Sequence, residues 1–101
     1  MAFWDVVQSG HVRQAVAEYD LLGQDEFLSR HGFGRARAYL LIIDGTAYDS
    51  KAVLGVAYGY ATGRTLRSSD FSGGAKHAAA VLRDLGFEVR NVRDPMPPSP
   101  G

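Results

Sequence analysis

The sequence predicts an α+β domain in which about four helices pack against one small three-stranded sheet. Apolar residues recur at helical spacing in four stretches, and an Asp-Gly pair between two short apolar segments is typical of a β-hairpin. A last segment, Phe87–Val92, alternates apolar and polar residues as a half-buried strand does. The expected order is helix, helix, strand, strand, helix, helix, strand (ααββααβ), with the helices on one face of the sheet.

Two helices are expected in the first third of the chain. The first begins at Ser9 or Gly10 and ends at Gly23, with one apolar stripe at helical spacing. The second spans residues 24–31, has acidic residues in its first turn and is followed by Gly32 as a left-handed cap. The stripe of the first helix consists of Val12, Ala15, Val16, Tyr19 and Leu22.

A hairpin is expected next. Residues 37–43 are rich in aromatic and β-branched side chains and form the strongest predicted strand of the chain. Asp44-Gly45 follows, and both residues of such a tight turn must adopt positive φ angles. Residues 46–48 form the short return strand, which leads directly into a third helix.

The third helix is predicted to begin at Asp49 or Ser50, either of which can cap it, and to run to about Tyr60. Its Gly55 and Gly59 lower helix propensity, which predicts a close packing neighbour. The residues expected to face inward are Ala52, Val53, Val56, Ala57 and Tyr60.

After an exposed basic loop at residues 61–71, a fourth helix is predicted to start at residues 72–74 and to end at Gly86. The strand that follows it is expected to pair with the hairpin. These elements form one domain, residues 1–93, and the proline-rich residues 94–101 are expected to be a linker or tail.

The chain has 101 residues and no cysteine, which excludes disulfides and thiolate metal sites. No apolar run approaches the ~20 residues that span a bilayer, so we expect a cytoplasmic protein without membrane contact. His11, His31 and His77 are dispersed and lack zinc-ligand spacing. Asp44 with Asp49-Ser50-Lys51 echoes metal-dependent nucleases, but Asp44 belongs to the turn and Lys51 to a helix. We therefore expect no enzyme activity, catalytic residue, metal or cofactor.

The net charge is zero, but it is unevenly distributed. Residues 1–29 carry one arginine and five carboxylates, a balance of −4, whereas residues 30–76 carry seven basic and three acidic residues, a balance of +4. Positive charge on one face lets even a neutral protein bind phosphate backbones.

The candidate DNA-binding residues lie in this basic part, at two predicted helix starts and in the segments beside them. Helix N-termini offer free N–H groups to phosphate, and arginine suits bidentate contacts. Each residue also has an ordinary explanation, as a helix cap, a tight turn or a solvated surface charge. The candidates are Arg35, Arg37, Tyr48, Ser50, Lys51, Arg64, Arg67, Ser72, Gly73, Gly74 and Lys76.

Four segments, taken together, resemble the N-terminal head domain of ScoMcrA-like restriction endonucleases of actinomycetes. The segments are residues 12–33, 48–53, 70–74 and 81–89, and their order and spacing carry the resemblance rather than any single motif. In that family the head precedes modules that read modified DNA and a C-terminal HNH nuclease. The resemblance implies a non-catalytic module of a modification-dependent restriction system.

Two functions follow as hypotheses. The first is a module that binds double-stranded DNA, in unmodified or modified form, beside further domains of the same polypeptide. The second is a protein-interaction or dimerisation head, whose contact surface would be the acidic first helix pair or the apolar end at Trp4. The arrangement of acidic and basic segments in space decides between them.

Overall fold

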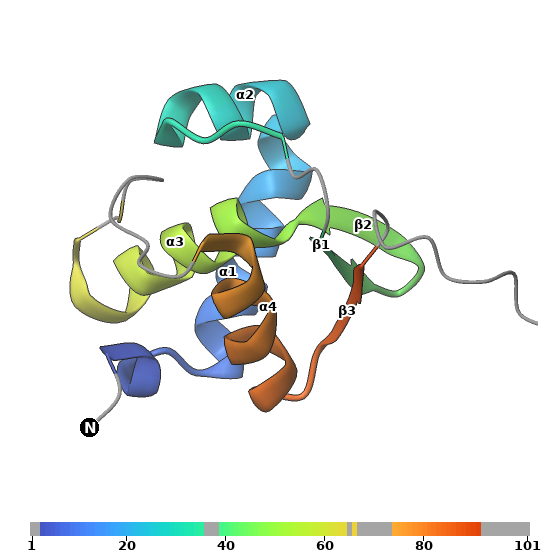
Figure 1. Cartoon of the computed structure of the whole chain (residues 1–101). Helices are drawn as coiled ribbons and strands as arrows, with labels where there is room; N and C mark the ends of the chain where they lie inside the picture. The colour runs from blue at the N-terminus through green and yellow to red at the C-terminus, as the bar shows by residue number, and fades with distance from the viewer. Residues whose placement is uncertain (1–2, 36–38, 65, 67–73, 92–101) are drawn as a thin grey trace, which may run out of the picture.

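The fold is seen in a computed structural model that describes residues 3–35, 39–64, 66 and 74–91 (Figure 1). The order ααββααβ is confirmed, with a short 3-10 helix ahead of it. The elements are η1 (Phe3–Val6), α1 (Ser9–Leu22), α2 (Gln24–His31), β1 (Tyr39–Ile43), β2 (Thr46–Asp49), α3 (Ser50–Thr62), α4 (Gly74–Asp84) and β3 (Glu88–Asn91).

The three strands form one antiparallel sheet in the order β2-β1-β3, so the predicted pairing of the last strand with the hairpin is confirmed. The hairpin turn has the predicted geometry: Asp44 and Gly45 both have positive φ, 51° and 79°. Leu41 lies opposite Tyr48 on one side and Val89 on the other. All three side chains are buried, which defines the inner face of the sheet.

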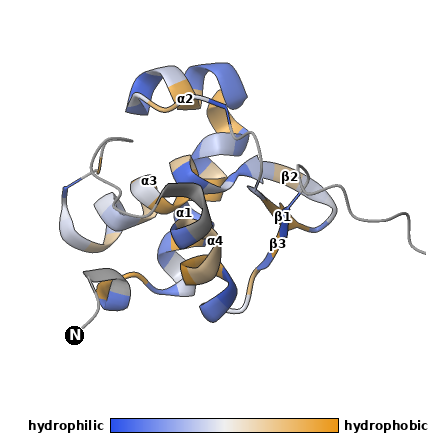
Figure 2. Ribbon diagram, in the orientation of Figure 1, coloured by the Kyte–Doolittle hydropathy of each residue, from blue (hydrophilic) through white to orange (hydrophobic). Residues whose placement is uncertain are grey.

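The core lies between this inner face and the helices. α1 packs most extensively against α3, and α4 contacts β1, β3 and α3. Figure 2 shows hydrophobic residues gathered between these elements, whereas the outer turns of α2 are hydrophilic. α3 is buried on nearly all sides from Ser50 to Ala57, so it is the central helix of the domain. No helix in the described part of the chain is long and apolar enough to cross a membrane.

The close neighbour predicted for Gly55 is the ring of Phe33. A Cβ built on Gly55 would lie 2.6 Å from Cζ of Phe33 and 3.3 Å from the backbone oxygen of Leu66. Gly55 has no unusual φ, so the reason for glycine here is space rather than backbone conformation. The segment before β1 and the segment after α3 therefore meet over one side of α3.

Two expectations for α3 were wrong. Tyr60 is 43% exposed rather than inward, because its hydroxyl reaches Glu18 on α1. Asp49 is the residue before the helix, but its carboxylate makes no capping bond and is turned into the interior. Ser50 already belongs to the helix. The predicted boundary near residue 93, the proline-rich tail and the side chain of Trp4 lie outside the residues that can be described.

Candidate functional site

The buried carboxylate of Asp49 ties α1 and α2 to the hairpin. Asp49 is 2% exposed, and Tyr19 and Gln24 donate hydrogen bonds to its Oδ2 at 2.6 and 2.9 Å. Buried charge requires such donors, because an unpaired carboxylate would lose its hydration without compensation. Burial, followed by the bond to Asp49, raises the pKa of Tyr19 well above its usual range. Asp49 is therefore a structural residue rather than a group available to a ligand.

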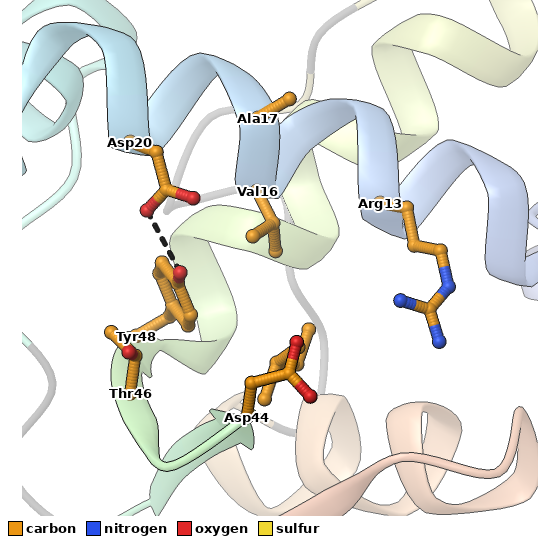
Figure 3. Close-up of a pocket in the computed structure, with 8 residues that line it drawn as sticks. Arg13, Val16, Ala17, Asp20, Asp44, Thr46 and Tyr48 are labelled. Atoms are coloured by element: carbon orange, nitrogen blue, oxygen red, sulfur yellow. Dashed lines mark hydrogen bonds between the residues drawn. The ribbon is translucent and has the colours of Figure 1, made fainter.

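The hydroxyl of Tyr48 donates to Asp20 of α1 at 2.8 Å (Figure 3). Burial and this bond raise the pKa of Tyr48 to about 12. Both tyrosines remain protonated donors at neutral pH: Tyr48 bonds Asp20 of the acidic first third of the chain, and Tyr19 bonds Asp49 of the hairpin.

A third cluster joins α1, α2 and α3 at Glu18. His31 contacts Glu18 at 2.6 Å, and Tyr60 donates to the other carboxylate oxygen at 2.8 Å. Partial burial raises the pKa of Glu18, but the bonds from His31 and Tyr60 and the charges of His31 and Arg30 together hold it below its usual value. Glu18 is consequently an anion that links α1 to α2 and α3.

Two arginines of the basic middle segment also face the acidic helices. Arg35 pairs with Asp25 at 2.9 Å, and Arg30 pairs with Glu26 at 3.4 Å. The hydrogen bond and charge of Asp25 raise the pKa of Arg35, to which the charge of Asp49 adds. Both pairs are solvent-exposed, so each is weak and open to exchange with another anion.

Arg64 lies at the other end of α3. Gly63 adopts the left-handed conformation that ends the helix, and the Thr62 hydroxyl accepts a bond from the Arg64 backbone N–H at 3.1 Å. The Arg64 side chain is exposed and has no hydrogen-bond or ion-pair partner among the described residues. Its backbone N–H is thus bonded, and its guanidinium is exposed.

The predicted site residues do not all reach the surface. Tyr48 is 4% exposed, and Ser50 is fully buried with its Oγ donating to the Tyr39 carbonyl at 2.7 Å. Neither side chain can touch DNA in this conformation. Lys51 is half-buried in the first turn of α3, and the 13 residues of that helix place it about 20 Å from Arg64.

The remaining predicted residues can be described only in part. Gly74 is the first residue of α4, and Lys76 lies in its first turn with a side chain outside the described atoms. Arg37, Arg67, Ser72 and Gly73 lie outside the described residues.

The structure does not bring Arg35 and Arg64 together. Arg35 pairs with Asp25 in the first turn of α2 and lies within range of the charge of Asp49, the residue before α3. Arg64 follows the opposite, C-terminal end of α3. The two segments that carry these arginines meet through Phe33 and Leu66, both of which lie next to Gly55.

Sequence reasoning overlooked a cleft of about 340 Å³ between α1 and the hairpin (Figure 3). α1 contributes Arg13 and Asp20 to its lining, and the hairpin contributes Asp44 (Figure 3). The Arg13 guanidinium lies 5.5 Å from the ring centroid of Phe87. The available signal was the spacing of Arg13 and Asp20, seven residues apart on one side of α1.

No nucleophile with an adjacent base lines this cleft. Its lining residues are Arg13, Val16, Ala17, Asp20, Ile43, Asp44, Thr46 and Tyr48. Across the described residues, no group of three or more His, Cys, Asp or Glu side chains could hold a metal ion. The groups with evident binding chemistry are therefore the exposed arginines.

Comparison with known proteins gives two matches that agree. Residues 5–91 match the family described as ScoMcrA-like, N-terminal head domain. A solved structure, described as the type IV phosphorothioation-dependent restriction endonuclease ScoMcrA, is 33% identical with a TM-score of 0.63. The match covers 86% of this chain and 13% of that much longer chain. No match is found among curated proteins. The chain therefore belongs to the ScoMcrA-like N-terminal head domain family.

Proposed function

We propose that this head domain is a non-catalytic DNA-binding module of a modification-dependent restriction system. The observation that carries the proposal is the exposure of the Arg35 and Arg64 side chains on a head domain whose solved relative is a restriction endonuclease. Arginines suit this role because their guanidinium groups bind phosphate oxygens in a bidentate manner. The proposed ligand is double-stranded DNA in the cytoplasm, reached together with further domains of a longer polypeptide.

The proposed surface extends from these two arginines into the basic residues next to them in sequence. Arg37 lies two residues beyond Arg35, and Arg67 lies three beyond Arg64. Lys76 and the start of α4 complete the predicted set. Lys51 is a peripheral contact at most, since it is half-buried. Tyr48 and Ser50 take no part in the surface, because their side chains serve the interior.

The pairing of Arg35 with Asp25 fits this role. An exposed ion pair contributes only about 0–1 kcal/mol, so a DNA phosphate can replace Asp25 at little cost. The carboxylates of Glu18 and Asp20 on α1 are, by contrast, bonded by tyrosine hydroxyls of the fold, whereas Asp25 and Glu26 on α2 stay exposed.

The test is fluorescence-anisotropy binding to short duplexes at 50 and 200 mM salt. For each phosphate neutralised, log K should fall by about 0.9 per tenfold increase in salt. The double variant Arg35→Ala with Arg64→Ala should weaken binding and reduce that slope by about two. Arg90→Ala is the matched control, since Arg90 is equally exposed but lies on the sheet. Binding that does not change with salt would refute contact with the DNA backbone.

The finer question is whether the head distinguishes modified DNA. The solved relative is a phosphorothioation-dependent enzyme, and that modification lies in the phosphate backbone that the arginines would contact. We propose that the head contacts the backbone at or near such linkages. Unmodified, methylated and phosphorothioated duplexes of one sequence should be compared at the same salt. Tighter binding to the phosphorothioated duplex alone would support this assignment, and equal affinities would restrict the head to general backbone contact.

A further inference from the structure

β1 has a composition that the fold described so far does not explain. Its five residues, Tyr-Leu-Leu-Ile-Ile, are all apolar. An antiparallel sheet covered on one face normally alternates apolar and polar residues, whereas a continuous apolar run is typical of a strand buried on both faces. Only one face of this sheet is covered by the described helices (Figure 1).

The register shows which residues lie on the uncovered face. Leu40 and Ile42 alternate with the buried Leu41, so both lie on the other face of β1, where Leu40 has the buried Asp49 of β2 as its register partner. Both are half-buried, and neither packs against the core, whereas their neighbours Tyr39 and Ile43 do. Ile42 lies between Ala47 of β2 and Glu88 of β3, both of which are exposed. The outer face thus has an apolar centre along β1.

A charged pair lies beside this centre on β3. Arg90 contacts Glu88 at 2.8 Å, with the two side chains 64% and 54% exposed. Arg90 lies opposite Leu40, and Glu88 lies opposite Ile42. The face therefore presents one cation and one anion side by side next to two aliphatic side chains.

We propose that the outer face of the sheet, formed by Leu40, Ile42, Ala47, Glu88 and Arg90, is an interface with a second copy of this chain. A two-fold axis brings a patch onto the same patch of its partner, so a suitable patch must complement itself. An apolar centre bordered by adjacent opposite charges meets that condition. In the dimer, Arg90 of each copy faces Glu88 of the other while the Leu40 and Ile42 side chains of the two sheets interdigitate.

This interface differs from the surface proposed for DNA and does not depend on it. Arg64 follows the C-terminal end of α3, which belongs to the layer on the inner face of the sheet, and Arg35 pairs with Asp25 on α2. The dimer therefore leaves both copies of that surface open. Loss of DNA binding would not affect self-association, and a monomeric protein would not affect the DNA proposal.

Sedimentation velocity over a wide range of protein concentration tests the interface directly. The weight-average sedimentation coefficient should rise with concentration for the wild-type protein. Ile42→Asp should abolish this rise, because it places a charge at the apolar centre. Leu21→Asp is the matched control: Leu21 is 84% exposed on α1, away from the sheet, and its replacement should leave association unchanged.

Charge exchange provides a second test that does not depend on the apolar centre. Arg90→Glu places two anions on the rim, and Glu88→Arg places two cations there. Each variant alone should associate about tenfold more weakly or worse, because like charges then face one another across the axis. An equimolar mixture of the two should regain wild-type association as a heterodimer. Far-UV circular dichroism of each variant confirms that the fold is retained.

Three results would overturn the proposal. The first is a wild-type protein that stays monomeric at the highest concentration reached. The second is association that survives Ile42→Asp, and the third is a mixture of the charge variants that associates no better than either one alone. If the wild-type protein is monomeric, the outer face of the sheet would instead bind a different partner, such as another domain of a longer polypeptide.

Discussion

Replacing Gly55 by alanine perturbs the point at which Phe33 and Leu66 contact α3. The added methyl carbon would lie 2.6 Å from Cζ and 3.2 Å from Cε2 of Phe33, and 3.3 Å from the backbone oxygen of Leu66. Ordinary carbon contacts are about 3.5–4.0 Å, so the ring must move by about 1 Å. Phe33 is 7% exposed and packed in the core, which leaves it little room to do so.

The expected magnitude is the difference between two opposing effects. Overpacking a well-filled site costs about 1–3 kcal/mol. Alanine is better than glycine inside a helix by about 1 kcal/mol, which offsets part of that cost. The net result should be a loss of about 1 kcal/mol in the free energy of unfolding, in the middle of a range of roughly 0–2 kcal/mol. For a chain of this size the melting temperature falls by about 4–8 °C for each kcal/mol.

Urea unfolding followed by circular dichroism at 222 nm measures this loss, with Gly10→Ala as the control. Gly10 also lies in a helix, but a Cβ there would meet nothing within 4 Å. Gly10→Ala should therefore leave stability unchanged or raise it by up to about 1 kcal/mol. Phe33→Leu in the Gly55→Ala background should recover part of the loss, since a smaller side chain leaves space for the methyl group. Gly55→Ala protein that is as stable as the wild type would refute the steric argument.

Three further predictions concern the buried polar network. Tyr19→Phe should cost about 1–3 kcal/mol, because it removes a donor from a carboxylate that is 2% exposed, and urea unfolding measures this. Glu18→Gln should destabilise the protein at neutral pH but not in acid. The pKa of Glu18 is lowered in the folded protein, so the ionised carboxylate stabilises the fold above the unfolded pKa of 4.5. That stabilisation is lost as the pH falls through the folded pKa. Thermal melts from pH 7 to pH 3 would show the two curves converging. Tyr48 should lose stabilising effect as pH rises from 10 to about 12, because its folded pKa is raised, and Tyr48→Phe should remove that part of the alkaline decline.

Most of the fold was predictable from local rules. The apolar stripe of α1, the glycines that end α1 and α2, and the Asp-Gly turn each depend on backbone geometry or periodicity within a few residues. Gly23, Gly32 and Gly45 all have the positive φ that such positions require. The pairing of β3 with β1 followed from the small number of strands available.

The errors arose where distant residues compete with a local rule. Asp49 has the residue type and position of a helix cap. Its carboxylate instead accepts hydrogen bonds from Tyr19 and Gln24 in the interior. No local pattern shows that Tyr19, 30 residues away, carries the donor. Tyr60 likewise matched the apolar stripe of α3, but a bond to Glu18, 42 residues away, holds it at the surface.

The candidate site was less predictable than the fold. Charge balance identified the basic middle segment, but it could not show that Asp25 and Glu26 would pair with Arg35 and Arg30. Nor could it show that the two arginine-bearing segments would meet beside Gly55. That meeting depends on Phe33. The sequence predicted that Gly55 has a close packing neighbour, but it did not identify Phe33 as that neighbour.

The burial of α3 limits how this domain can read DNA. A recognition helix must place an exposed face in the major groove, but α3 is buried from Ser50 to Ala57. α2 is exposed, yet its outer turns carry Asp25 and Glu26, which a phosphate backbone would repel. Positive charge is left to the segments around Arg35 and Arg64. Side chains on such segments contact phosphates, and phosphate contacts position a protein without reading bases. The head should therefore bind unmodified duplexes of different sequence with equal affinity, and any selectivity it has should come from the chemistry of the backbone.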